Sequence, residues 1–332
     1  MAARRRGKKK SGRSYAWRYR GRIVACVFVE VIIICALVIM IGWNKGVKEW
    51  FEQFEQPLLK EVDISGINSP NAILMQARGG KILGEINGEA QIYPASMTKI
   101  MTVILGIENF DDLDEKITLT NEMFTGLYEQ DATQAGFQPG EEVRVIDLLY
   151  GAMLPSGAEC CIALADTISG SEADFAELMN KKARKLGMEN THFCDSTGLH
   201  NPDHYSTVKD IAVLMKYCIK NDTFREIVET SRHSTGVTNI HPDGITYYST
   251  MFKNLSDPTV TGGKILGGKT GYTSEAGHCL VSFAEIEGRE YIFVSAGASG
   301  ADGNTIPHIQ DAVTVYNKVG AAIEAKMNDN NK

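Results

Sequence analysis

The sequence predicts an α+β fold, in which both ends of a soluble body build one antiparallel sheet and a helical subdomain is inserted between them, with a transmembrane helix in front. Three observations predict it. A candidate β-hairpin lies near each end of the body, the sequence between the hairpins has helical apolar spacing, and a long apolar run lies near the N-terminus. The chain has 332 residues, 43% hydrophobic and 23% charged, a composition that allows a packed core and excludes collagen-like chains.

The first 43 residues predict a basic cytoplasmic tail and a membrane anchor. Residues 1–22 hold ten of the 34 lysines and arginines and no acidic residue, and residues 23–43 form an apolar run of 21 residues. Such a run can cross about 30 Å of hydrocarbon, and the positive-inside rule keeps its basic flank in the cytoplasm. A cleaved signal peptide is the alternative, but its apolar region is usually about 7–15 residues and ends at an Ala-x-Ala-like site, which is missing here. We expect a single-pass protein of the cell membrane with an extracytoplasmic body.

The rest of the chain is acidic. Outside the basic tail, 24 lysines and arginines stand against 41 acidic residues, which gives a formal net charge of −17. A nucleic-acid-binding body is expected to be basic, so the sequence argues against nucleic acid as a partner. Five of the seven cysteines lie outside the apolar run, mostly in apolar segments. We expect free thiols rather than a disulfide framework, and neither a metal site nor a cofactor.

The body is expected over residues 69–325, between a partly helical juxtamembrane linker at 44–68 and a polar tail at 326–332. Strands are predicted as two hairpins: Ala72–Gln76 with Lys81–Ile86, and Cys279–Ile286 with Tyr291–Ser295. Helices are predicted at Ser96–Ile107, Val145–Met153, Ala158–Ile168, Glu172–Leu186, Thr207–Ile219, Asp222–Thr230 and from Ile306 to about Ala325.

The first chemical motif is Ser96-Met97-Thr98-Lys99, at the start of an apolar helix. Residues three apart share one face of a helix, so the Ser96 hydroxyl and the Lys99 amine are expected to lie about one turn apart. An amine can activate a serine nucleophile when burial and a nearby cation lower the pKa of the amine. Alone the motif is weak evidence, because about one match is expected by chance in a chain of this length.

The second motif is Ser156-Gly157-Ala158, in a turn between two apolar helical segments. The Ser156 hydroxyl could relay a proton. Taken by itself, the motif favours a different interpretation, in which Ser156 is the N-cap of the following helix.

The third motif is Lys269-Thr270-Gly271, directly before the last hairpin. A lysine and a threonine on an exposed strand edge can hold a carboxylate, and a glycine lets an extended peptide backbone approach closely. The alternative is a glycine-rich turn with a solvated lysine. Only about 0.1 matches are expected by chance, so this motif carries more weight than the first.

Together the three motifs resemble those of penicillin-recognising serine enzymes. The chain is similar to the D-alanyl-D-alanine carboxypeptidases, the low-molecular-weight penicillin-binding proteins, from about Asn71 to Lys318. Further family-like segments occur in family order at Tyr93–Thr102, Ser196–Pro202, His204–Thr207 and Lys269–Gly277. The resemblance implies the fold of the DD-peptidases and serine β-lactamases.

The resemblance also implies a reaction. Ser96 would attack the carbonyl between the last two D-alanines of a peptidoglycan stem peptide, Lys99 would be the general base, and Ser156 would pass the proton to the leaving amine. An acyl-enzyme would form, and water would hydrolyse it. The implied partners are a pentapeptide ending in D-Ala-D-Ala, β-lactam antibiotics that acylate the same serine, and the membrane.

Four further residues would bind the substrate. Lys269 and Thr270 would hold the terminal carboxylate, Gly271 would admit the peptide, and the backbone N–H of Tyr272 would form the oxyanion hole with that of Ser96. Lys269 would also act as the second cation that lowers the pKa of Lys99.

Two departures from the family pattern concern single residues at the expected site. The family usually has Asn where this chain has Ala158, and losing one well-placed hydrogen-bonding group can cost about 10² to 10³ in rate. Either turnover is slow, or another group such as Glu159 compensates. The second departure is His308, which falls near the position of a family arginine that anchors the carboxylate. We expect His308 to be a histidine on a surface helix rather than a ligand.

Two alternatives remain. A catalytically weak, penicillin-recognising wall-binding protein is suggested by Ala158. A serine β-lactamase would share the three motifs, but the class with a glutamate base needs a segment such as E-x-x-x-N, which does not occur between Ser156 and Lys269.

Overall fold

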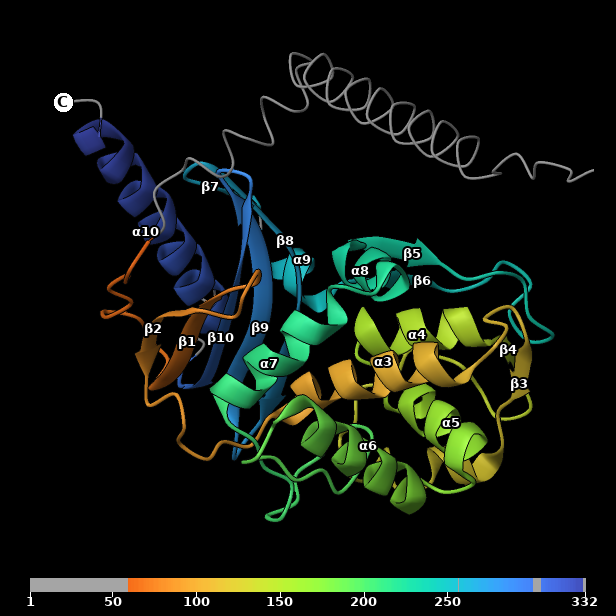
Figure 1. The fold of residues 1–332 in the computed structure, drawn as a ribbon. Coiled ribbons are helices and arrows are strands. Elements are labelled where there is room, and N and C mark those ends of the chain that lie inside the picture. The colour runs from red at the N-terminus through yellow and green to blue at the C-terminus, as the bar shows by residue number, and fades with distance from the viewer. Residues whose placement is uncertain (1–58, 256, 301–305, 331–332) are drawn as a thin grey trace, which may run out of the picture. The chain divides into compact units, whose positions relative to one another are not determined.

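The computed structural model describes residues 59–300, with the exception of 256, and residues 306–330 (Figure 1). The predicted basic tail, the predicted transmembrane helix and residues 44–58 of the predicted linker lie outside the described residues. Within the described part of the chain, no helix has both the length and the apolar character needed to cross a bilayer.

A six-stranded antiparallel sheet joins the two ends of the body. Its strands run in the order β2-β1-β10-β9-β8-β7. The bounds are β1 Asn71–Gln76, β2 Ile82–Ile86, β7 Thr259–Val260, β8 Gly263–Thr273, β9 Gly277–Ile286 and β10 Arg289–Ala298. Because β1 pairs with β10 along its whole length, the first and last strands of the body meet in one sheet, and the predicted α+β arrangement is confirmed.

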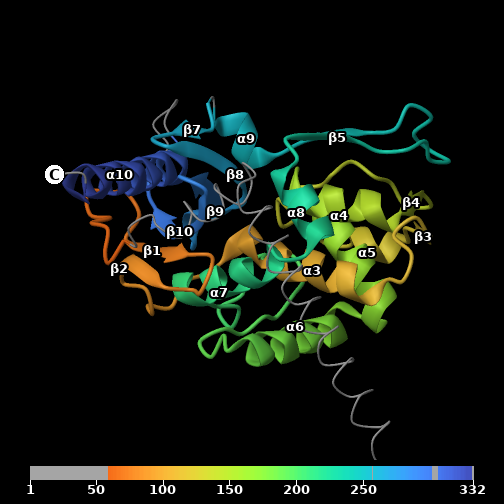
Figure 2. The same cartoon turned by 45° about the horizontal axis from the view of Figure 1, so that its top comes forward.

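Helices cover both faces of this sheet (Figure 1). The bounds are α3 Lys99–Asn109, α4 Val145–Met153, α5 Ala158–Ser169, α6 Glu172–Leu186, α7 Val208–Cys218, α8 Asp222–Glu229, α9 Thr250–Asn254 and α10 Pro307–Asn330. Short elements complete the subdomain: 3-10 helices η1 Ala95–Thr98 and η2 Asn121–Phe124, and strand pairs β3 Lys116–Thr118 with β4 Glu142–Arg144 and β5 Arg232–Ser234 with β6 Thr246–Tyr248. Figure 2 shows α10 on one face of the sheet and α7 on the other.

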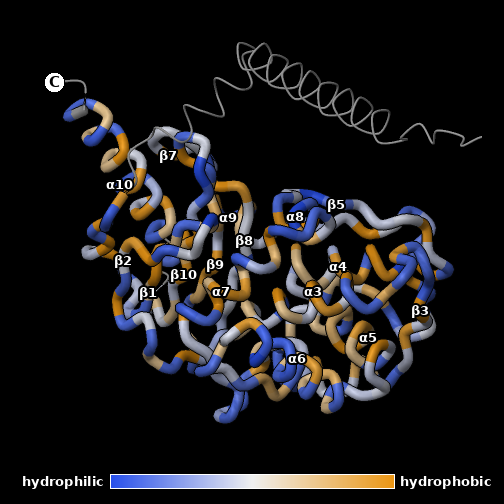
Figure 3. Tube along the Cα trace, viewed as in Figure 1, coloured by the Kyte–Doolittle hydropathy of each residue, from blue (hydrophilic) through white to orange (hydrophobic). Residues whose placement is uncertain are grey.

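Alternating side chains of β9 build two hydrophobic cores. Val281 and Phe283 join the large core of the helical subdomain, whereas Leu280 and Ala284 join the smaller core beneath α10. This alternation is the two-residue period of a strand buried on both faces. The helix α3 lies within the large core, and its first eight residues are all buried. Figure 3 shows apolar residues along α3 and the central strands.

Most predicted helices agree with the structure to within two residues at each end, because their caps are encoded locally. The side chains of Ser171, Thr207 and Asn221 accept hydrogen bonds from backbone N–H groups in the first turns of α6, α7 and α8. Gly170 and Gly187 end α5 and α6 in the left-handed conformation, with φ of 82° and 78°.

The body is longer than predicted at both ends. Leu59, Val62 and Ile64 are buried in the core beneath α10, so the described part of the linker packs on the body instead of leading up to it. The last helix continues to Asn330, past the predicted end at Ala325, because no glycine or proline follows Gly320 to stop it.

Candidate active site

Ser96 lies on a tight turn in front of α3. The sequence predicts an α-helix from Ser96, but the structure has the 3-10 helix η1, and α3 begins at Lys99. Ala95, directly before Ser96, has φ of 47°, which is a strained conformation for a residue with a side chain. Such strain is often found at functional sites.

Ser96 and Lys99 are in hydrogen-bond contact. The Lys99 Nζ donates to Ser96 Oγ at 3.0 Å and to the backbone carbonyl of Thr197 at 2.7 Å. Lys99 is only 3% exposed, and burial lowers the pKa of its amine. A neutral amine at this distance can take the proton of the serine hydroxyl. The carbonyl of Thr197 was not identified from the sequence, since a backbone oxygen leaves no signature in a motif.

Ser156 and Lys269 form a second pair of the same kind. The Lys269 Nζ donates to Ser156 Oγ at 3.0 Å and to the carbonyl of Thr270 at 2.9 Å. Ser156 has φ of 73°, and the N-cap position of α5 belongs to Gly157, so the N-cap interpretation of Ser156 is wrong. Burial lowers the pKa of Lys269, and the charge of Lys99 lowers it further. Because this repulsion is mutual, a proton on either amine disfavours a proton on the other.

The strand β8 passes directly beside the serine turn. A side chain on Gly271 would place its Cβ 3.0 Å from the backbone nitrogen of Ser96, so any other residue would have to push the serine turn away by a few tenths of an ångström. The Thr270 hydroxyl lies 2.7 Å from the hydroxyl of Thr250, at the start of α9. β7 pairs with β8 only at Gly263 and Lys264, so in the described structure the rest of β8 has no strand on its outer side. A free strand edge can bind an extended peptide.

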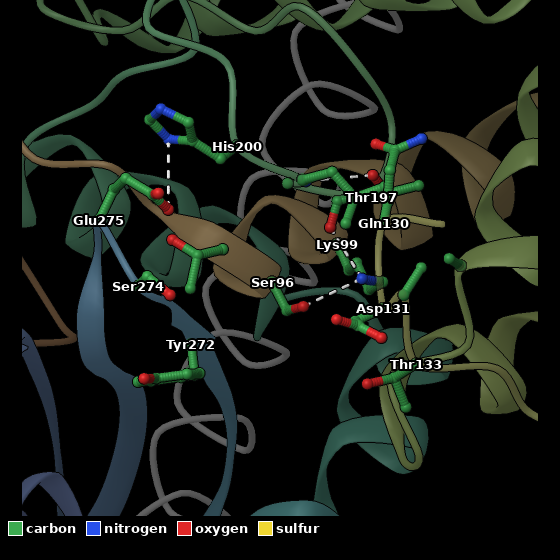
Figure 4. Close-up of a pocket in the computed structure, with 15 residues that line it drawn as sticks. Ser96, Lys99, Gln130, Asp131, Thr133, Thr197, His200, Tyr272, Ser274 and Glu275 are labelled. Atoms are coloured by element: carbon green, nitrogen blue, oxygen red, sulfur yellow. Dashed lines mark hydrogen bonds and ion pairs between the residues drawn. The ribbon is translucent and has the colours of Figure 1, made fainter. Parts of the chain in front are cut away.

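A cavity of about 450 Å³ opens over the serine (Figure 4). Its walls come from η1, the end of β8, residues 130–133 and residues 197–200. Of the seven predicted site residues, Ser96, Lys99 and Tyr272 line it, and the other four, Ser156, Lys269, Thr270 and Gly271, are not among its lining residues. Figure 4 shows the Ser96 and Lys99 side chains directed toward each other.

Ala158 also lines this cavity, but its neighbour Glu159 does not. Glu159 is fully buried, and its Oε1 accepts from the backbone N–H groups of Ala135 at 2.6 Å and Gly136 at 2.9 Å. Its Oε2 has no hydrogen-bond partner among the described residues, and burial raises the pKa of the carboxyl. Glu159 therefore holds a loop in place and does not substitute for the amide that Ala158 lacks.

His308 is buried, so the prediction of a surface histidine is wrong. It is 4% exposed, and its ring stacks on His278 of β9 at 5.1 Å, with 7° between the planes. The first turn of α10 packs against β9, which turns this side chain inward. The His278 ring in turn lies 4.6 Å from that of Tyr272. Burial and repulsion from His278 lower the pKa of His308 to about 4, so His308 is uncharged at neutral pH.

The thiols agree with the prediction. Cys160, Cys161, Cys218 and Cys279 are free and buried, and Cys194 is free and partly buried.

Three comparisons with known proteins agree with one another. Residues 59–300 match the peptidase S11 family, D-alanyl-D-alanine carboxypeptidase. D-alanyl-D-alanine carboxypeptidase DacF of Bacillus subtilis is 35% identical over 233 residues, which are 69% of this chain and 57% of DacF. DacC of Escherichia coli is 33% identical over 71% of this chain and 58% of its own length. The chain thus spans less than two thirds of the length of these relatives.

Solved structures show the same similarity. The crystal structure of the Streptomyces K15 DD-transpeptidase is 29% identical, with a TM-score of 0.68 over 77% of this chain and 98% of its own. A D-alanyl-D-alanine carboxypeptidase from Mycobacterium tuberculosis has a TM-score of 0.69 at 22% identity over 79% of this chain and 94% of its own, a likeness of fold.

Proposed function

Because the chain belongs to the D-alanyl-D-alanine carboxypeptidase family, we propose that it is a serine carboxypeptidase that removes the terminal D-alanine from peptidoglycan stem peptides. One observation carries the proposal: the hydroxyl of Ser96 lies 3.0 Å from the buried amine of Lys99, at the floor of a cavity beside a free strand edge. A hydroxyl, a desolvated base and room for a peptide are the parts that acyl transfer needs.

In the proposed acylation, Ser96 Oγ attacks the carbonyl between the two D-alanines and its proton moves to the neutral amine of Lys99. The C–N bond then breaks, and the leaving nitrogen takes a proton from the Ser156 hydroxyl. The hydrogen bond from Lys269 to Ser156 Oγ supports this role, because a donor to the hydroxyl oxygen stabilises the negative charge that develops there as Ser156 gives up its proton. Ser156 regains its proton from the ammonium of Lys99.

Deacylation reverses these roles. Water gives one proton to Lys99 and attacks the ester carbonyl. The ester C–O bond then breaks, Lys99 returns the proton to Ser96 Oγ, and the shortened peptide leaves as a carboxylic acid. The backbone N–H groups of Ser96 and Tyr272 would stabilise the oxyanion in both steps, and Thr270 would bind the terminal carboxylate. The close approach of β8 to Ser96 at Gly271 supports this placement.

A penicillin should acylate the same serine, which gives the first test. We expect the residue 59–332 protein, which spans the whole packed body, to be labelled by a fluorescent penicillin and to release D-alanine from a pentapeptide ending in D-Ala-D-Ala. Ser96→Ala should abolish both signals while the melting temperature stays unchanged. Labelling that persists in Ser96→Ala would show that the nucleophile is wrongly assigned.

A catalytically weak, penicillin-recognising wall-binding protein is the second candidate. Ala158 favours it, because no side-chain amide stands at this position of the cavity wall and Glu159 is directed elsewhere. Penicillin labelling without D-alanine release would support this candidate. A β-lactamase would instead release the hydrolysed penicillin rapidly.

The proposed location is the cell membrane, with the body outside the cytoplasm and the pentapeptide as the substrate met there. The apolar run at 23–43 and the basic residues at 1–22 support this proposal. Protease added to intact spheroplasts should remove the body and leave the N-terminal tail protected. A body that survives such treatment would contradict the orientation.

A further inference from the structure

A chain of hydrogen bonds, buried at Thr98 and His204 and partly exposed at Asp195, runs behind Lys99. The hydroxyl of Thr98, the residue before Lys99, lies 2.9 Å from His204 Nε2, and His204 Nδ1 lies 3.1 Å from Asp195 Oδ2. Thr98 is fully buried and His204 is 2% exposed. A polar network buried to this degree is expensive unless its members satisfy one another, as they do here.

The second carboxylate oxygen of Asp195 returns the chain to Lys99. Asp195 Oδ1 accepts from the backbone N–H of Thr197 at 2.7 Å, from the Thr197 hydroxyl at 2.8 Å and from the N–H of Gly198 at 2.6 Å. The carbonyl of the same Thr197 accepts from Lys99 Nζ at 2.7 Å. Since Thr98 and Lys99 are neighbours, the hydrogen bonds close a ring around the start of α3.

Gly198 fixes this ring against the serine turn. Its φ is 80°, and a Cβ at this position would lie 1.9 Å from the carbonyl oxygen of Ala95. The segment 195–198 is therefore in direct contact with the backbone that precedes Ser96. Any movement of Asp195 would pass to the carbonyl that holds Lys99 and to the turn that presents the nucleophile.

Asp195 also brings a charge. Burial alone would raise the pKa of its carboxyl, but the hydrogen bonds from His204 and Thr197 outweigh burial and lower the pKa to about 2. Asp195 is thus a carboxylate at neutral pH, and its charge raises the proton affinity of Lys99.

The other titratable groups that face Lys99 are the thiols of Cys160 and Cys161, the carboxyl of Glu159 and the amine of Lys269. Burial raises the pKa of both thiols, so they are uncharged at neutral pH. Burial also raises the pKa of Glu159. Asp195 is therefore the one acid in this set whose pKa lies below its ordinary value.

We propose that Asp195 is a positioning residue for the general base: through Thr197 and His204 it holds the amine of Lys99 against Ser96, and its charge sets the pH above which Ser96 is acylated efficiently. This inference rests on the proposed function. It assigns roles to Asp195, His204 and Thr98, which the three motifs do not contain.

Asp195→Asn tests the charge, because asparagine has the same shape and its oxygen can still accept from Thr197 and Gly198. Loss of the negative charge lowers the pKa of Lys99, so the neutral amine forms at lower pH. We expect the acidic limb of the pH–rate profile for fluorescent-penicillin acylation to move to lower pH by about one unit. Asp195→Ala also removes the tether, and its plateau rate should fall about 100-fold.

Glu172→Gln is the matched control. Glu172 Oε1 accepts from the backbone N–H of Ser196 at 3.1 Å and from its hydroxyl at 2.6 Å, so Glu172 restrains the same segment, and its charge is not among the largest influences on the pKa of Lys99. The acidic limb of the pH–rate profile of Glu172→Gln should coincide with that of the wild-type protein. Thr98→Val removes only the hydroxyl that is hydrogen-bonded to His204. Its plateau rate of acylation should fall several-fold, and the acidic limb of its pH–rate profile should not move. This variant tests the positioning role if Asp195→Asn does not fold.

Four results would overturn the inference. They are an acidic limb of Asp195→Asn that stays in place or moves to higher pH, an equal shift in Glu172→Gln, a plateau of Asp195→Ala that matches the unchanged protein, and an unchanged plateau in Thr98→Val. Absence of label on the unchanged protein would instead overturn the proposed function, and the inference with it. The two failures are therefore distinguishable in one set of measurements.

Discussion

Two lysine–serine pairs lie side by side in this molecule with nearly the same contact and different surroundings. Lys99 and Lys269 each donate to a serine hydroxyl at 3.0 Å, and burial lowers the pKa of both amines. Lys99 lines the cavity and faces the carboxylate of Asp195, whereas Lys269 does not line the cavity and faces the amine of Lys99. A hydrogen bond from a lysine to a serine therefore does not by itself identify the lysine as a general base. Access to substrate and the surrounding charges do.

Arginine at each lysine position would separate the two pairs most strongly. An arginine cannot lose its proton near neutral pH, so Lys99→Arg should lower the rate of penicillin acylation by about 10³ or more. Lys269→Arg keeps a hydrogen-bond donor beside Ser156 and should lower the rate only about tenfold. The two rates, measured with the same fluorescent penicillin, would contradict the comparison if Lys269→Arg lost as much as Lys99→Arg.

A substitution of Gly198 should disrupt the contact that holds Ser96 and Lys99 in place. In Gly198→Ala the new Cβ meets the carbonyl of Ala95, so we expect the free energy of unfolding to fall by about 3 kcal/mol and acylation to slow about 100-fold. Gly170→Ala is the control, because Gly170 has a similar φ of 82° but nothing within 4 Å of the added atom. It should cost about 1 kcal/mol and leave acylation unchanged. Equal losses in urea unfolding would show that only backbone conformation matters at Gly198.

A substitution of Ala158, in the cavity wall, tests whether the missing side-chain amide limits turnover. Because Glu159 does not supply the missing amide, Ala158→Asn should raise D-alanine release by about tenfold or more. Ala158→Leu introduces a branched side chain with as many non-hydrogen atoms as asparagine but no amide, so it should not raise D-alanine release. If neither variant releases D-alanine faster, the cavity is adapted to the alanine.

The smallest expected effect concerns stability in acid. The pKa of Asp195 is about 2 when folded and 3.8 ordinarily, so its contribution to stability is present above about pH 4 and is lost as pH falls through 2. The difference in unfolding free energy between the unchanged protein and Asp195→Asn should therefore shrink by about 2 kcal/mol between pH 5 and pH 1. A difference that is constant across this range, measured by urea unfolding, would contradict the assigned ionisation of Asp195.

The parts of the site that lie on regular elements could be predicted from the sequence. Ser96 and Lys99 sit one turn apart because residues three apart in a helical turn share a face, and the predicted sheet follows from the two hairpins. Helix ends were predictable where a side chain such as Thr207 caps them.

The groups that position those residues could not be predicted. The carbonyl of Thr197 and the ring through His204 depend on contacts between segments about 100 residues apart. The depth of His308 depends on the angle at which α10 packs on β9, which no local pattern contains. Sequence spacing therefore found the reacting groups, and only the packed structure shows what orients them.

Whether Lys99 activates Ser96 can be tested by mass spectrometry of a proteolytic digest after incubation with benzylpenicillin. We predict one covalent adduct with the mass of intact penicillin on the peptide that contains Ser96, and its absence from the Lys99→Arg protein over the same time. An adduct on another residue, or no adduct on the unchanged protein, would contradict the claim that Lys99 activates Ser96 for acyl transfer.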